Sequence, residues 1–160
     1  MNIRTAALSD LAAITAVEAA CFLPSEAASE KIFAARLRLY PNHFWLLEDN
    51  DSIVGFINGM VTDELTIRDE MFENAGLHNE DGDWQAFFGL TTIPEYRRQG
   101  CAAKIMERAI FEAKAQRRKG CILTCKDTLI HYYEKFGYKN LGISKSVHGG
   151  AVWYDMRLTF

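Results

Sequence analysis

The chain has 160 residues, of which 49% are hydrophobic and 24% are charged, with a formal net charge of −3 at pH 7. A chain of this size can bury about two-thirds of its unfolded surface without disulfides or metals, which predicts a single domain over residues 1–160. The acidic balance argues against a nucleic-acid partner, and no apolar run suggests a membrane span or an export signal, so we expect a cytoplasmic protein.

Helices and strands alternate in the first half of the chain. Ser9 or Asp10 can cap the first predicted helix and Ser25 the second, and Pro41 ends the second helix. The pattern predicts a strand over 2–6, helices over 9–22 and 25–40, strands over 43–48 and 53–61 around a polar turn, and an acidic segment over 63–77 that is a helix or a lid.

The second half begins with an apolar strand and ends in a hairpin. A glycine pair, Gly149-Gly150, separates the last two strands, which we expect to be antiparallel. The pattern predicts a strand over 86–92, a helix from about 101 to 113, a strand over 121–125, a helix over 127–136, and strands over 139–147 and 151–159. This order of elements indicates a mixed α/β fold without internal repeats.

The stretch 86–113 has the composition of an anion site. Its strand ends at Pro94, which cannot donate to a sheet, and a basic turn containing Gly100 leads directly into an amphipathic helix. Free backbone N–H groups and the positive end of the helix dipole meet at such a turn, and glycine lets a phosphate approach the backbone.

These residues carry a resemblance to a known family. Arg97, Gly100 and Ala102 match the pyrophosphate-loop pattern Q/R-x-x-G-x-G/A of the GCN5-related N-acetyltransferases (GNAT), and the similarity extends over the whole chain. Within that superfamily the chain most resembles the arylalkylamine (serotonin-type) N-acetyltransferases and their bacterial relatives. The segments that carry this closer likeness read CFLP at 21–24, LTCKD at 123–127 and YYEKFGY at 132–138.

The resemblance implies a GNAT fold and acetyl-CoA as co-substrate, with no metal. The expected fold is a twisted, mostly antiparallel sheet of about six or seven strands flanked by about four helices, with a V-shaped splay between two central parallel strands. Backbone N–H groups at Leu90 and Thr92 would polarise the thioester carbonyl, and a pantetheine arm would follow that strand edge. The expected cofactor-binding residues are Leu90, Thr91, Thr92, Arg97, Arg98, Gln99, Gly100, Cys101, Ala102 and Ala103.

Tyr133 matches the tyrosine that relatives place beside the thioester sulfur. A phenol is protonated at pH 7 and can give its proton to a departing thiolate, so Tyr133 is the candidate general acid. The alternative is an aromatic residue that only packs in the core or against CoA.

The general base is left open by the sequence. Animal relatives carry two histidines on the strand before the loop, and Ala86 and Phe88 replace them here. The remaining candidates are Asp83, or a water chain to Glu64 or Asp63. The amine can also react through its small neutral fraction, because an alkylammonium with a pKa of about 10 is not a nucleophile.

An apolar pocket is expected for the amine. In the resembled family the break after the first helix forms a mobile wall, and a residue at the tip of the last hairpin borders the acceptor; an ordinary core role for the apolar residues and a solvated turn for the histidine are the alternatives. The expected substrate-binding residues are Phe22, Leu23, Pro24, Phe88, Thr124 and His148.

Four cysteines are present, and none belongs to a Cys-x-x-Cys pair. Cys121 and Cys125 fall on one predicted strand with their side chains about 13 Å apart, which is too far for a disulfide. Cys101 lies inside the loop, where direct acetyl transfer requires no nucleophilic thiol. Reduced, structural thiols are therefore expected.

The sequence thus predicts an acetyl-CoA-dependent N-acetyltransferase that acts on a small primary amine, with an arylalkylamine as the favoured class, through a ternary complex. A protein or peptide N-acetyltransferase, an idle acyl-CoA-binding module and a pure interaction protein are the alternatives. The expected oligomeric state is a monomer or a homodimer.

Overall fold

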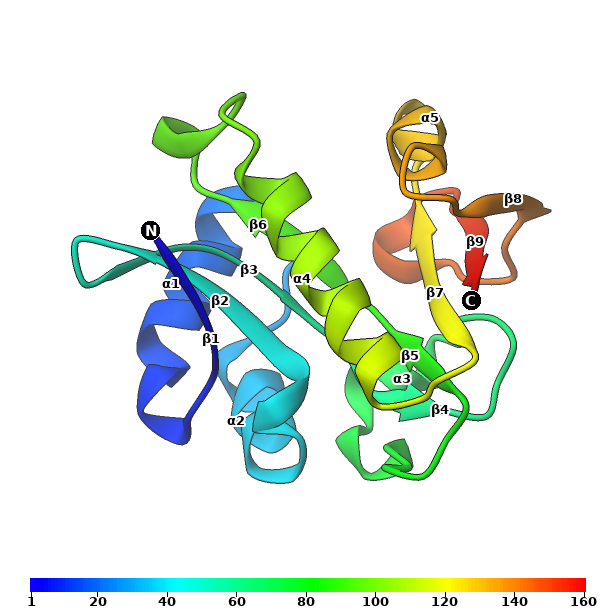
Figure 1. Ribbon diagram of the computed structural model, residues 1–160, viewed down its shortest axis with the longest axis horizontal. Coiled ribbons are helices and arrows are strands. Elements are labelled where there is room, and N and C mark those ends of the chain that lie inside the picture. Colours follow the sequence, from blue (N-terminus) through cyan, green and yellow to red (C-terminus); the bar gives the residue numbers. More distant parts are fainter. The chain divides into compact units, whose positions relative to one another are not determined.

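A computed structural model describes residues 1–160, and the chain divides into two compact units that are each built from two segments (Figure 1). Met1–Gly59 and Gly89–Ala109 form the first unit, and Met60–Phe88 and Ile110–Phe160 form the second. The chain therefore passes between the units at Gly59–Met60, at Phe88–Gly89, and within a helix at Ala109–Ile110.

The first unit contains a four-stranded antiparallel sheet in the order β1-β2-β3-β6. Asn50 and Asp51 have φ values of 50° and 63°, which suits a tight turn between β2 and β3. The predicted polar turn is therefore confirmed. The elements of this unit are β1 (Asn2–Thr5), α1 (Leu11–Cys21), α2 (Glu30–Leu39), β2 (Phe44–Asp49), β3 (Ser52–Asn58), β6 (Gly89–Thr92) and the first part of α4 (Cys101–Ala115).

An aromatic cluster forms the core beneath this sheet. The ring of Phe33 on α2 meets Phe44 at 6.2 Å and Phe56 at 5.9 Å, both edge to face. Gly55 of β3 lies where β6 and α4 come close, because a β-carbon there would lie 2.5 Å from the Thr91 carbonyl oxygen and 3.1 Å from the Ile105 side chain. The start of α4 is thus packed tightly onto the strands that precede its loop.

The second unit contains a five-stranded sheet in the order β4-β5-β7-β9-β8. The pair β5–β7 is parallel and the remaining pairs are antiparallel; Figure 1 shows β7 beside β9. The elements are β4 (Val61–Thr62), α3 (Glu70–Glu73), β5 (Trp84–Ala86), the end of α4, β7 (Gly120–Cys125), α5 (Ile130–Glu134), β8 (Lys139–Ile143) and β9 (Tyr154–Thr159).

The predicted strand 86–92 is divided between the two sheets. Its beginning, β5, pairs with β7, whereas β6 pairs with β3, and Phe87 and Phe88 lie between the two pieces. The mixed α/β GNAT fold is confirmed. The single sheet expected from the sequence is present as two sheets, with β6 and β7 in different ones.

Several predicted boundaries differ from the structure. The helix α2 begins at Glu30 and not at residue 25, because Ser29 is the residue whose hydroxyl caps it, accepting from the Ile32 N–H at 3.3 Å. The acidic segment 63–77 contains only the short α3 and a 3-10 turn at Ala75–Leu77. None of the helices combines the length and the apolar character that a membrane crossing requires.

Candidate active site

The turn before α4 has the geometry of an anion-binding loop. Gly100 has a φ of +79°, and a β-carbon added there would meet no atom within 4 Å, so the space beside it is open. The first helical bond runs from the Lys104 N–H to the Gly100 carbonyl at 3.1 Å. The N–H groups of Cys101, Ala102 and Ala103 precede that bond and have no carbonyl within the helix, which leaves them for a ligand.

The two arginines of the loop differ in their surroundings. Arg97 is turned back onto the strand end, where its Nε donates to the Thr92 carbonyl at 3.0 Å and its guanidinium also contacts the Cys21 thiol. Burial raises the pKa of that thiol and Arg97 opposes the change. Arg98 is exposed, with a left-handed φ of 62°. Arg97 therefore fixes the loop, and Arg98 is the more available of the two charges.

The strand β6 ends in a buried hydroxyl that has no partner. Thr92 is 8% exposed, and its Oγ1 makes no hydrogen bond. Thr92 pairs with Gly55, whose missing side chain would point at α4, so the Thr92 side chain faces α4 as well. Leu90 lies on the same face of the strand, and Thr91 lies on the other face with its hydroxyl bonded to the Phe56 backbone.

Tyr133 is buried on α5 in the second unit. Its ring meets Tyr132 at 5.3 Å and Tyr138 at 5.9 Å, both edge to face. Burial, followed by the neighbouring Cys125 and Tyr132, raises the pKa of Tyr133 well above its usual value of 10. The phenol therefore keeps its proton at neutral pH and above it.

Two of the expected acceptor residues share an aromatic cluster in the second unit. The ring of Phe72 stacks on His148 at 4.4 Å and meets Phe88 at 5.2 Å. Trp153 lies beyond, 6.1 Å from His148, and its indole N–H donates to the His148 carbonyl at 2.8 Å. Sequence reasoning assigned no role to Phe72, although its place in the acidic, lid-like segment was the available signal.

The other expected acceptor residues are spread over both units. Phe22 in the first unit contacts β6, since a β-carbon at Gly89 would lie 3.5 Å from its ring. Leu23 is 62% exposed and Pro24 is exposed too, in the turn between α1 and α2. Thr124 is half-buried on β7, opposite Asp155 of β9.

The three acidic candidates for the base all have surface partners. Asp83 forms an ion pair with Lys119 at 3.2 Å, and Glu64 forms one with Arg68 at 3.0 Å. Asp63 accepts from the Asp83 N–H at 3.0 Å and from the Asn79 side chain at 3.2 Å. These contacts explain the acidic residues of this region as parts of turns.

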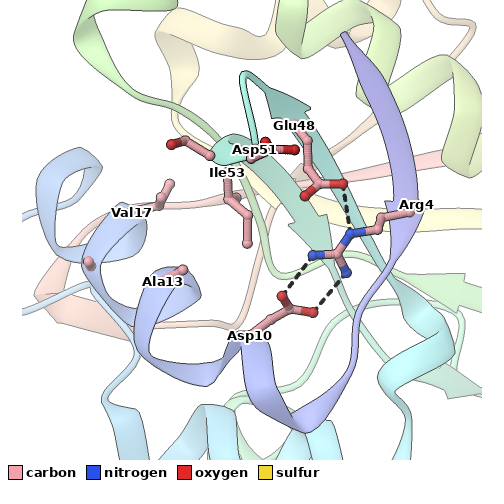
Figure 2. Close-up of a pocket in the computed structure, with 9 residues that line it drawn as sticks. Arg4, Asp10, Ala13, Val17, Glu48, Asp51 and Ile53 are labelled. Atoms are coloured by element: carbon pink, nitrogen blue, oxygen red, sulfur yellow. Dashed lines mark hydrogen bonds and ion pairs between the residues drawn. The ribbon is translucent and has the colours of Figure 1, made fainter.

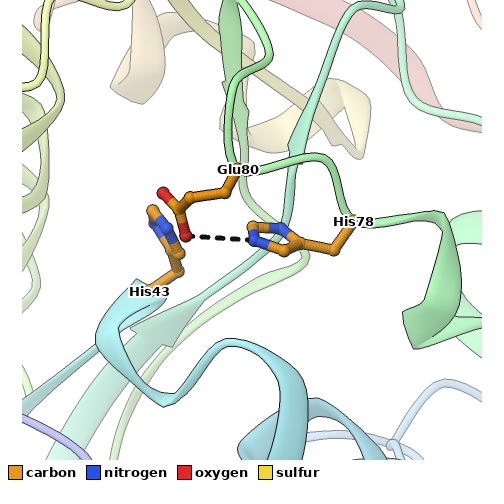
Figure 3. A group of neighbouring side chains, drawn as sticks. All are labelled: His43, His78 and Glu80. Carbon is orange, nitrogen blue, oxygen red and sulfur yellow. Dashed lines mark hydrogen bonds and ion pairs between the residues drawn. The ribbon is translucent and has the colours of Figure 1, made fainter.

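The histidines outside the last hairpin have structural surroundings. His43 is fully buried and lies against Trp45, with 6.0 Å between the ring centroids. The Val61 N–H donates to His78 Nδ1 at 3.0 Å, which assigns the neutral ring's proton to Nε2, and that nitrogen contacts Glu80 at 3.2 Å (Figure 3). His131 is exposed.

A buried carboxylate, Glu18, was missed by sequence reasoning. It is 5% exposed on α1, its Oε2 accepts from the Ala28 N–H at 2.9 Å, and its Oε1 has no hydrogen-bond partner. Burial raises its pKa from 4.5 to about 7, and the Ala28 bond and Arg36 only partly oppose that rise. The available signal was that Glu18 is the one charged residue in the helix sequence LAAITAVEAAC.

A cavity of about 380 Å³ also opens in the first unit (Figure 2). Its wall carries the Arg4 guanidinium, which forms ion pairs of 2.8 Å with both Asp10 and Glu48. None of the expected site residues lines it. The cavity is therefore bordered by a compensated ion-pair network.

Comparison with known protein families identifies the family of the chain. A family model described as "Acetyltransferase (GNAT) domain" matches residues 41–140, which is more than half of the chain. The chain is a member of the GNAT acetyltransferase family. It is accordingly an N-acetyltransferase by family, and the loop before α4 and Tyr133 fall within the matched region.

Solved GNAT structures share the fold over nearly the whole chain. The GphF GNAT-like decarboxylase in complex with isobutyryl-CoA is 21% identical, with 99% of both chains covered and a TM-score of 0.86. The loading GNATL domain of CurA from Lyngbya majuscula is 17% identical, covering 99% and 96% of the two chains with a TM-score of 0.81. The ribosomal-protein-S18-alanine N-acetyltransferase from Escherichia coli is 20% identical, covering 99% and 92% with a TM-score of 0.74. Identities this low establish a common GNAT fold and do not identify the acceptor.

Proposed function

We propose that this GNAT protein transfers an acetyl group from acetyl-CoA to a small primary amine, by direct attack in a ternary complex. The observation that carries the proposal is the turn at Gly100, where an open space faces backbone N–H groups at the start of α4. A pyrophosphate is the ligand class that such a turn accommodates.

Acetyl-CoA would be held by this loop and by the adjoining strand. The N–H groups of Cys101, Ala102 and Ala103 would bind the pyrophosphate, with charge added by Arg98. The β6 backbone at Leu90 would polarise the thioester carbonyl, and the unpartnered Thr92 hydroxyl offers a further contact for the pantetheine arm. Tyr133 would protonate the departing thiolate, since its phenol carries a proton at neutral pH.

An arylalkylamine is the acceptor class that we favour. The rings of Phe72, Phe88 and His148 form an aromatic surface in the second unit, and Phe22 is an aromatic residue beside β6 in the first. Aromatic and apolar surfaces of this kind suit a substrate that couples an aromatic tail to an amine.

Two other activities are represented among the proteins of similar fold. One is N-acetylation of an alanine of a ribosomal protein, as the name of the Escherichia coli enzyme states, and the other is decarboxylation, as in GphF. The assay described below detects both activities. The arrangement of aromatic residues in this chain favours a small amine as the acceptor.

The test measures thiol release from acetyl-CoA with a panel of acceptors. The panel contains tryptamine, phenethylamine, spermidine, free amino acids and short peptides with free N-termini, and malonyl-CoA without an amine is included for decarboxylation. Saturable turnover with the arylalkylamines supports the proposal. Turnover with peptides alone, or loss of carbon dioxide from malonyl-CoA, overturns the small-amine assignment, and failure to bind acetyl-CoA by calorimetry overturns the loop assignment.

A further inference from the structure

We propose that Glu18 is the general base of the transfer and accepts a proton from the amine beside Gly89. This inference rests on the proposed function and fills the role that the histidine pair performs in the resembled enzymes. The residues from which Glu18 is assigned this role all lie in the first unit, where α1 packs against β6.

The geometry begins with the free oxygen of the carboxylate. Glu18 Oε1 is buried and unpartnered, and it lies 3.9 Å from the place that a β-carbon at Gly89 would occupy. The Phe22 ring is 3.5 Å from the same point. The absence of a side chain at Gly89 therefore leaves room for about a methyl group beside the carboxylate oxygen and the aromatic edge. This space directly precedes Leu90, where the thioester carbonyl is proposed to lie.

The two carboxylate oxygens of Glu18 differ in their hydrogen bonding. The Oε2 atom accepts from the Ala28 N–H at 2.9 Å and so holds the turn between α1 and α2. That bond would be satisfied equally by a glutamine oxygen, so it does not explain why an ionisable group stands here. A buried carboxylate oxygen without a partner is unfavourable in the folded protein, and such groups concentrate at functional sites.

The charged groups around Glu18 set its ionisation. Arg36 from α2 favours the carboxylate, and Cys21 lies on the same helix with Arg97 of the loop at its side. Tyr40 at the end of α2 faces Arg36. Burial outweighs these effects and brings the pKa of Glu18 to about 7, close to the range in which a general base is most effective.

The step balances as follows in atoms and charge. The carboxylate takes one proton from the amine nitrogen while the nitrogen lone pair forms the C–N bond with the thioester carbonyl carbon. The C–S bond then breaks, the thiolate takes its proton from Tyr133, and the products are the acetamide and CoA. Glu18 returns its proton to water, and Tyr133 regains one from water.

The experiment compares the wild-type chain with Glu18→Gln, Glu18→Asp and a control, Glu30→Gln, which alters an exposed carboxylate at the start of α2. The substrate is the panel amine with the highest kcat/KM. We expect Glu18→Gln to lower kcat by about 100-fold or more and to abolish the acidic limb of the pH profile near pH 7. The affinity of Glu18→Gln for acetyl-CoA and the kcat of the control variant should remain within about twofold of the wild-type values. Glu18→Asp should retain part of the activity, with the acidic limb of its pH profile shifted.

Several results separate this inference from its rivals. Wild-type activity with an equally active Glu18→Gln variant overturns the inference and leaves the proposed function intact, whereas an inactive wild type overturns the proposed function. A Glu18→Gln variant that loses activity only because it is unstable would melt below wild type at pH 8, and that result would overturn the catalytic role. If the variant does not fold, the pH profile of the wild-type rate tests the inference instead. An acidic limb near pH 7 that does not move on warming identifies a carboxyl group, and a limb that follows the pKa of the chosen amine overturns the proposal.

Discussion

The Asp69 carboxylate accepts a hydrogen bond from the Ser146 hydroxyl across 77 positions of sequence. The same carboxylate accepts from the Val147 N–H at 3.0 Å. These bonds hold the loop that carries His148 against the segment that carries Phe72, and the two rings stack. The aromatic surface proposed for the acceptor therefore depends on a polar clamp at its edge, by which we mean the two hydrogen bonds that Asp69 accepts from Ser146 and Val147.

Removing this clamp should weaken amine binding. We expect Asp69→Ala to raise KM for the amine about tenfold, because two hydrogen bonds that order the His148 loop are lost, while the affinity for acetyl-CoA is unchanged. Initial-rate measurements with each substrate varied in turn check this result. Glu73→Ala, which alters an exposed carboxylate of the same short helix, is the control. An unchanged KM for the amine would remove the aromatic cluster from the acceptor site.

A carboxylate at Gly100 should repel the pyrophosphate. We expect Gly100→Asp to weaken acetyl-CoA binding at least about tenfold by calorimetry. Gly142→Asp is a matched control, because Gly142 also has a positive φ, of 100°, and an equally open surrounding, so backbone strain is similar in both variants. Equal affinities of the two variants would contradict the anion site.

Loss of the Tyr133 hydroxyl should affect the chemical step. We expect Tyr133→Phe to lower kcat by about 100-fold with little change in KM, since the proton is given only in the transition state. Tyr132→Phe, on the same helix, should remain near wild type. The raised pKa of Tyr133 means that the phenol stays protonated through pH 9, so the wild-type rate should show no loss of this acid there. A change confined to KM would assign Tyr133 to binding.

Ionisation of Glu18 should lower the free energy of unfolding as the pH rises, which is the opposite of the usual effect of a carboxyl group. Its pKa is raised on folding, so the native state binds the proton more tightly and stability is lost as the pH rises from 4.5 through about 7. Above pH 7 the penalty approaches about 3 kcal/mol, from a difference of about 2.5 between the two pKa values at about 1.4 kcal/mol each. Glu18→Gln should therefore unfold at higher denaturant concentration than wild type at pH 8, with a smaller difference at pH 5. A variant that is destabilised at both values would show that the carboxylate is favourable in the fold.

The sequence allowed the loop before α4 to be located because its signals are local. A strand, a proline, a glycine and an amphipathic helix follow one another within 86–113, and the helix does begin at Cys101. The division of the strand at Phe87 and Phe88 was not predictable from the same stretch. Both pieces are apolar, and pairing with β3 or with β7 is decided by residues distant in sequence.

Glu18 illustrates a second limit of local patterns. The apolar period of α1 places Ile14 and Val17 on one face of the helix, and both are buried. Ala20 falls on the same face by that period but is exposed, whereas Glu18 is buried. The burial of Glu18 follows from the turn after the helix, where the Ala28 N–H meets its carboxylate. Hydrophobic periodicity contains no information about such a partner ten residues further on.

The division of each unit into two chain segments has a consequence for biosynthesis. The first sheet lacks its fourth strand until residues 89–92 have left the ribosome, and the packing of Ile105 against Gly55 requires residue 105 as well. The N-terminal 59 residues therefore cannot complete their sheet, and one edge of β3 stays uncovered, while the first segment of the second unit is synthesised. At about 5–20 residues per second this interval lasts a few seconds, during which the nascent chain is most exposed to mispairing. A pause in translation between codons 59 and 89 would lengthen that interval and favour aggregation over folding.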